Sequence, residues 1–127
     1  MTTIYGPKLD LISHDDANRT STFRVSYSLH QSAVERLMVG LRYREKIELR
    51  EADASESDGC LYAFTVSTFP GTRRNHIDRN RTVTLADDML DEDGVFRPVD
   101  DVYARVCVSS PLVRATRNTS NPISHKF

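Results

Sequence analysis

The chain has 127 residues, a length that suits one domain with its own hydrophobic core. Its hydrophobic content of 39% and charged content of 28% are ordinary for a globular protein and too apolar for a disordered one. The 17 basic and 18 acidic side chains give a formal net charge of −1, which argues against nucleic acid as a partner, because nucleic-acid-binding domains usually carry a basic excess.

The first residues do not resemble an export signal. Residues 1–8 lack both a basic start and an apolar run, and no apolar stretch reaches the ~20 residues that cross a bilayer. We therefore expect a soluble, cytoplasmic protein without a membrane partner. The terminal segments 1–18 and 115–127 are weakly patterned, and we expect them to be weakly ordered.

Two segments, 22–30 and 41–50, alternate apolar and polar residues with a period of two, which is typical of strands that lay one face on a core. The apolar residues of the first are Phe23, Val25, Tyr27 and Leu29. Those of the second are Leu41, Tyr43, Ile47 and Leu49. Glu45 interrupts the apolar face of the second segment and indicates a β-bulge there or a strand that begins later.

A short helical crossover is predicted between these strands, near 32–39. Ser32 is followed three residues later by Glu35, which resembles a capping box, and Gly40 is a suitable end. An irregular connection is the alternative.

Three further strands follow. Segment 60–69 is apolar on both faces in its first half, which indicates a central strand, and Pro70-Gly71 ends it. Segment 81–85 is a short strand, and 101–109 alternates again. Five strands without a long helical pattern predict an all-β, antiparallel β-sandwich formed as a single domain over 1–127, with an immunoglobulin-like sandwich as the preferred form.

The two cysteines, Cys60 and Cys107, both fall in predicted strands. A bridge between neighbouring or facing strands is geometrically conceivable. We favour two small buried thiols in a reducing compartment.

An acidic stretch, 87–101, carries seven carboxylates. Such hard oxygen ligands suit Ca²⁺, and the candidate ligands are Asp91, Asp93 and Asp100. Flanking helices and a ligand at the first loop position are missing, so this is no EF-hand. The favoured alternative is a turn at Asp93-Gly94 with acidic residues that keep the strand ends solvated.

A basic loop follows the third predicted strand. Its guanidinium and imidazole groups could hold a phosphate or a carboxylate through forked contacts. The candidate residues for a ligand or a partner are Arg73, Arg74, His76, Arg79 and Arg81. The alternative is that this loop pairs with the acidic stretch, within one molecule or between two.

No catalytic residue is identified: the four histidines are scattered, and no nucleophile-elbow motif is present. We therefore expect a small non-enzymatic β-sandwich that acts in protein–protein interaction or self-assembly. Its contact surface would be the two charged loops or the polar face of the second strand, Arg42, Arg44, Lys46, Glu48 and Arg50. The alternatives are a module that binds calcium or an anionic ligand through 87–101 and 73–81, with Ca²⁺ as its one cofactor, and an enzyme assembled from distant loops.

Overall fold

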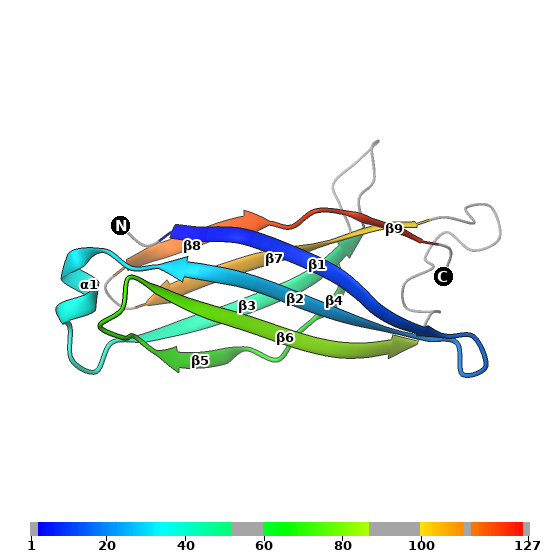
Figure 1. Ribbon diagram of the computed structural model, residues 1–127, viewed down its shortest axis with the longest axis horizontal. Helices are drawn as coiled ribbons and strands as arrows, with labels where there is room; N and C mark the ends of the chain where they lie inside the picture. The colour runs from blue at the N-terminus through cyan, green and yellow to red at the C-terminus, as the bar shows by residue number, and fades with distance from the viewer. Residues whose placement is uncertain (1–2, 52–59, 87–99, 111–112, 126–127) are drawn as a thin grey trace.

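The computed structural model describes residues 3–51, 60–86, 100–110 and 113–125. These residues form two antiparallel sheets packed face to face and one short helix, so the all-β sandwich predicted from the sequence is confirmed (Figure 1). The elements are β1 (Thr3–Asp15), β2 (Thr20–His30), α1 (Ala33–Leu37), β3 (Arg42–Glu51), β4 (Cys60–Ala63), β5 (Ser67–Pro70), β6 (His76–Ala86), β7 (Asp100–Ser110), β8 (Val113–Thr119) and β9 (Ile123–His125).

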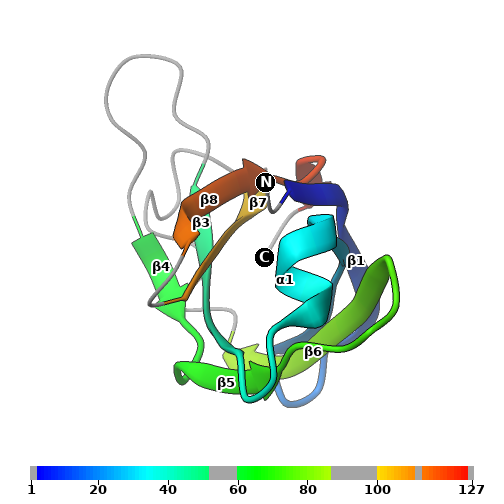
Figure 2. The same ribbon diagram turned by 90° about the vertical axis from the view of Figure 1, so that its left-hand side faces the viewer.

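The first sheet has three strands in the order β1-β2-β6. The second has six, in the order β4-β3-β7-β8, with β5 also pairing with β3 and β9 also pairing with β7. The strands β3 and β7 therefore form the centre of the second sheet, and β2 forms the centre of the first. Viewed from its end, the sandwich is capped by α1, which lies between the two sheets (Figure 2).

The core lies between the sheets and is built from the alternating faces of the central strands. The predicted apolar faces of β2 and β3 do point inward, and β7 adds Val102, Ala104, Val106 and Val108. Each of these four side chains is fully buried or almost so. Burial of such a face is the main stabilising contribution to a sandwich.

The prediction of one central strand over 60–69 is wrong. The chain forms two short strands there, β4 and β5, which both pair with β3, and β4 lies at the edge of the sheet. Between them the chain leaves the strand conformation at Phe64–Val66. This break changes the alternation, so that Phe64 and Phe69, five positions apart, both point into the core. The segment therefore contains two short strands of different phase rather than one strand covered on both faces.

The terminal segments 1–18 and 115–127 contain strands where the structure describes them, and the weak order that the sequence suggests for them stays a prediction. The N-terminal strand β1 pairs with β2 along most of its length. Asn121, which follows β8, accepts a hydrogen bond from the Leu9 backbone N–H at 3.1 Å and donates one to the Leu9 carbonyl, also at 3.1 Å. Asn118 donates to the Ile4 carbonyl at 3.1 Å. These side-chain amides form hydrogen bonds with backbone groups at the outer edge of β1, which the sheet leaves unpaired. Weak hydropathy patterning gives no sign of such contacts.

None of the described helices is long and apolar enough to cross a membrane. The immunoglobulin-like form and the cytoplasmic location stay predictions.

Candidate functional site

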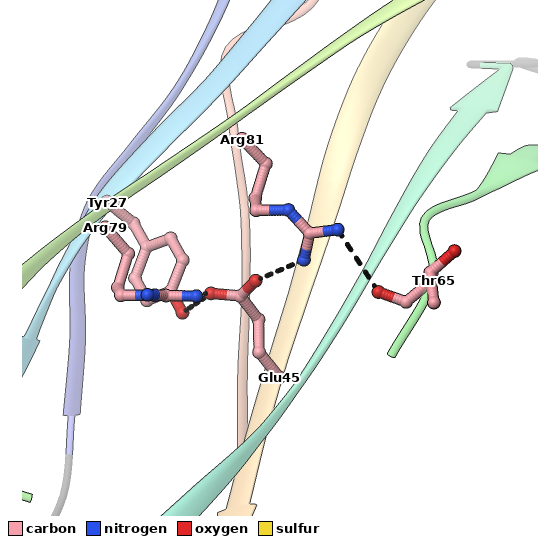
Figure 3. Close-up of polar contacts among 5 residues, drawn as sticks. All are labelled: Tyr27, Glu45, Thr65, Arg79 and Arg81. Atoms are coloured by element: carbon pink, nitrogen blue, oxygen red, sulfur yellow. Dashed lines mark hydrogen bonds and ion pairs between the residues drawn. The ribbon is translucent and has the colours of Figure 1, made fainter. Parts of the chain in front are cut away.

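A buried carboxylate links the two sheets. Glu45 in β3 is fully buried and accepts hydrogen bonds from Arg79 Nε at 3.1 Å and from Arg81 Nη1 at 2.9 Å (Figure 3). The Tyr27 hydroxyl of β2 donates to the same carboxylate. Glu45 therefore faces the core without a bulge, since β3 pairs with β7 in unbroken register from Arg44 to Glu51. Both predicted alternatives, a bulge and a later start, are wrong: β3 begins at Arg42, and three donors compensate the buried charge so that the strand stays regular.

The two arginines reach Glu45 from β6 across the side of the sandwich. The Arg79 guanidinium lies 4.4 Å from the centre of the Phe69 ring, and that of Arg81 lies 5.5 Å from the Phe64 ring. Arg81 Nη2 also donates to the Thr65 carbonyl at 3.3 Å. The two guanidiniums thus join β6 to β5 and to the segment before it through charge, hydrogen bonds and cation–π contacts.

The electrostatics of this cluster follow from burial and mutual pairing. Burial raises the pKa of Tyr27 well above its ordinary value, and the hydrogen bond to the Glu45 carboxylate raises it further. Burial is the largest influence on Arg79 and alone would lower its pKa, but the hydrogen bond and charge attraction to Glu45, together with the contact to Tyr27, outweigh it and leave the pKa above its ordinary value. Tyr27 therefore stays neutral and Arg79 stays charged. Because the carboxylate oxygens are occupied by donors of the same chain, we interpret this cluster as a structural link rather than a general base.

The five predicted ligand residues do not converge on one place. Arg73 and Arg74 lie exposed in the loop before β6, while Arg79 and Arg81 point inward to Glu45. His76 points away from the core, with Nε2 3.9 Å from an Asp78 oxygen and its ring 6.0 Å from that of His30. The reason is the length of β6. It begins at His76 rather than at residue 81, so its residues alternate between the two faces.

The predicted calcium ligands are not tested. Asp91 and Asp93 lie outside the described residues, and only the backbone of Asp100, at the start of β7, is described. Within the described part of the chain, no group of three or more His, Cys, Asp or Glu side chains could hold a metal ion. Cys107 carries a free thiol and is half-buried, and the side chain of Cys60 is not among those that the structure describes.

A second buried polar network fixes α1 at its end of the sandwich. Ser32 and Glu35 form the predicted capping box, in which Ser32 Oγ accepts from the Glu35 N–H at 3.2 Å and Glu35 Oε1 accepts from the Ser32 N–H at 3.1 Å. The Tyr43 hydroxyl lies 2.8 Å from Glu35 Oε2 and 3.0 Å from Gln31 Oε1. Gln31 Nε2 donates to the Arg74 carbonyl at 2.9 Å. The helix and the loop before β6 are therefore held together.

Against this rigid support, α1 and the turn after it expose apolar side chains. Val34 is 69% exposed, Leu37 is 81% exposed and Val39 is 96% exposed. Leu37 also lines a hollow of about 440 Å³ together with Ala33, Arg36 and Arg73. We call Val34, Leu37 and Val39, with Arg36, Arg73 and Arg74 beside them, the α1 surface. Sequence reasoning missed it, although a five-residue helix between strands can bury only one side and leaves Val34 and Leu37, three positions apart, on a shared face.

A second surface is strongly charged. The outward side chains of the second sheet form what we call the basic face, which comprises Arg42, Arg44, Lys46, Glu48 and Arg50 of β3, Arg105 of β7 and Arg117 of β8. Within the described side chains of this face, Glu48 is the one carboxylate, and it accepts from Arg50 Nη1 at 3.1 Å. The outward position of the five β3 residues is as the sequence predicts.

Comparison with known proteins gives no family. The chain matches no protein-family model and no curated protein. One similar solved structure is a structural-genomics target named SoR45, with 12% identity over 97% of this chain and 84% of that chain and a TM-score of 0.42. Another is a Bordetella pertussis protein described as ApaA, with 5% identity over 100% of this chain and 92% of that chain and a TM-score of 0.39. At this distance neither likeness carries an argument on function.

Proposed function

We propose that the protein is a non-enzymatic β-sandwich that binds a partner protein through the α1 surface. The observation that carries this proposal is the exposure of Val34, Leu37 and Val39, the three most exposed large apolar side chains among the described residues. Single exposed apolar side chains are common on any protein, but a group of them within six residues at one end of a domain is typical of an interaction site.

The energy available at this surface is of the right order for recognition. Complete burial of one Val or Leu side chain contributes about 1.5–3 kcal/mol. Association costs several kcal/mol in lost translational and rotational freedom, so only part of the burial energy of the three side chains appears as affinity. We therefore expect dissociation constants in the micromolar range. The capping box and the contacts of Glu35 and Gln31 hold α1 in place before binding, which lowers the ordering cost.

The charges beside the apolar residues define the partner's chemistry. Arg73 and Arg74 are exposed, and Arg36 Nη1 donates to Asn75 Oδ1 at 2.6 Å. In α1 and its flanking turns, 31–41, the one carboxylate is Glu35, which is 4% exposed. A complementary partner therefore presents apolar side chains bordered by Asp or Glu. A second copy of this chain fits less well, because a two-fold contact would bring its arginines together.

The proposal is tested by selecting from a displayed library of random peptides on the wild-type protein. A triple variant, V34S/L37S/V39S, serves for counter-selection, and circular dichroism checks that it is folded. Because all three residues are exposed, we expect its stability within about 0.5 kcal/mol of wild type. The expected result is a peptide consensus with apolar and acidic positions, whose synthetic form binds wild type and binds the triple variant at least about tenfold more weakly.

A matched control separates the α1 surface from general stickiness. The I12S/V66S variant removes two exposed apolar side chains elsewhere, at 48% and 42% exposure, and should keep the affinity. Equal loss in both variants, or a consensus without acidic positions, contradicts the proposal. Concentration-dependent dimerisation in sedimentation, abolished by V34S/L37S/V39S, would replace it with self-association.

A further inference from the structure

The basic face contains a hollow of about 350 Å³, close to the size of a small-molecule site. Its lining residues are Arg42, Tyr43, Arg44, Thr68, Ser109 and Ser110. None of them belongs to the α1 surface. The hollow thus offers a second binding function, independent of the proposed partner site.

The strand register gathers hydrogen-bond donors at this hollow. Arg44 of β3 is paired directly with Thr68 of β5 on one side and with Ser109 of β7 on the other. A guanidinium is therefore flanked by two hydroxyl-bearing residues in one row across three strands. Directly paired residues on neighbouring strands project to the same face, with Cβ atoms about 4.5–5.5 Å apart.

Arg42 adds a second guanidinium two positions along β3, about 6.6 Å from Arg44 by the rise of a strand. Its Nη2 donates to Thr68 Oγ1 at 3.2 Å. This contact holds the Arg42 side chain in place and leaves the Thr68 hydroxyl proton available for another acceptor.

The positive charge beside the hollow favours an anion as its ligand. None of the described residues that line the hollow is a carboxylate, and both arginines are exposed. Two like charges on one face of a strand repel each other, and an anion placed between them removes that repulsion. Guanidinium groups bind the oxygens of phosphate with forked, charge-assisted hydrogen bonds, and hydroxyl donors complete such a site.

We propose that this hollow binds a tetrahedral oxyanion of the phosphate type. Arg42 and Arg44 supply the charge, and the hydroxyls of Thr68 and Ser109 supply neutral donors. The ligand is free phosphate or a phosphate monoester carried by a larger molecule, since both present the same oxygens.

The test is isothermal titration of inorganic phosphate into the protein, with chloride keeping the ionic strength constant. We expect saturable binding in wild type and a loss of at least about tenfold in affinity in R42Q/R44Q. The matched control is K46Q/R117Q, which removes two positive charges from the same basic face outside the hollow and should retain binding within about twofold. Both variants alter exposed side chains, so both should fold.

Two further titrations identify the source of the anion. One uses a phosphoserine peptide, and the other uses phosphatidylcholine vesicles with and without phosphatidic acid. Tighter binding of the peptide or of the acidic vesicles than of free phosphate, lost in R42Q/R44Q, supports the site and names its source. Absence of phosphate binding at millimolar concentration, or equal weakening by the two double variants, overturns the proposal. Neither result affects the α1 surface, whose variants leave this hollow intact.

Discussion

Arg81 Nη1 donates to Glu45 Oε1 across 2.9 Å, and this ion pair joins the edge strand of one sheet to a central strand of the other. The Glu45 side chain is 0% exposed and that of Arg81 is 24% exposed, so the carboxylate depends on the chain itself for compensation. A buried charge that keeps its partners is tolerated, whereas one that loses them is strongly destabilising. The contact therefore makes the alignment of the two sheets sensitive to substitutions in β6.

Removal of both arginines that pair with Glu45 should lower the stability of the folded protein. The R79M/R81M variant leaves Glu45 buried with only the Tyr27 hydroxyl, and we expect the free energy of unfolding to fall by about 3–5 kcal/mol. Urea unfolding followed by circular dichroism measures it. Replacement of the whole cluster, in Y27F/E45L/R79M/R81M, should restore most of the lost stability, because apolar residues of similar volume often replace a buried ion pair without cost.

The control for this comparison is R24M, in which an arginine on the outer face of the first sheet, 49% exposed, loses its charge. We expect a change within about 0.5 kcal/mol. If R79M/R81M were no less stable than R24M, the link between Glu45 and β6 would have no energetic importance.

The pKa of Tyr27 predicts how stability changes in alkaline solution. Burial raises this pKa in the folded protein above the ordinary 10.0, which applies to the unfolded chain. Above about pH 10 the unfolded chain releases the Tyr27 proton while the folded protein keeps it, so the unfolded state binds fewer protons and stability falls as pH rises. Tyr27 should therefore lower the free energy of unfolding by about 1.4 kcal/mol for each pH unit above this value.

Urea unfolding of wild type and Y27F at several pH values between about 9 and 11 measures this slope. Y27F should be less stable at neutral pH by about 1–3 kcal/mol, since it removes a hydrogen bond to a buried carboxylate, and its stability should fall less steeply with pH. Y5F, at an exposed tyrosine, should keep the wild-type slope. Equal slopes in wild type and Y27F would show that Tyr27 titrates normally.

Asn121 should stabilise the edge of β1. Because its amide makes two hydrogen bonds to the Leu9 backbone, N121A is expected to lower the free energy of unfolding by about 1–3 kcal/mol. Hydrogen exchange should show faster exchange at the Leu9 amide. N80A, on the exposed face of β6, is the control and should change neither quantity. Unchanged exchange at Leu9 in N121A would contradict the contact.

The capping box should hold α1 in place. S32A removes the acceptor for the Glu35 N–H, and we expect a loss of about 1 kcal/mol in the free energy of unfolding. S28A, on the outer face of β2, is the matched serine control and should change stability by less than about 0.5 kcal/mol. Equal effects of the two substitutions would mean that the cap contributes nothing.

The strands with regular alternation were predictable from the sequence, and so was the helix cap. The faces of β2, β3 and β7 follow a period of two without interruption apart from Glu45, and Ser32 with Glu35 carries the cap. Local pattern suffices there, because each residue's direction follows from its position in the element.

The inter-sheet cluster was not predictable, although the sequence contains a signal for it. Glu45 stands out as a charge on an apolar face, and such a residue needs a partner on another strand. Arg79 and Arg81 share a strand face with Ile77 and Val83, but their role depends on which strand lies opposite β3. Strand order is a property of the tertiary fold, and no local pattern specifies it.

The most direct test of the proposed function is a nuclear magnetic resonance titration of methyl-labelled protein with the selected apolar–acidic peptide. The methyl resonances of Val34, Leu37 and Val39 should shift in proportion to peptide bound, while those of Val106 and Val108 in the core stay in place. Shifts confined to the basic face or to the outer face of the first sheet, with Leu37 unchanged at saturation, would contradict the assignment of the α1 surface as the partner site.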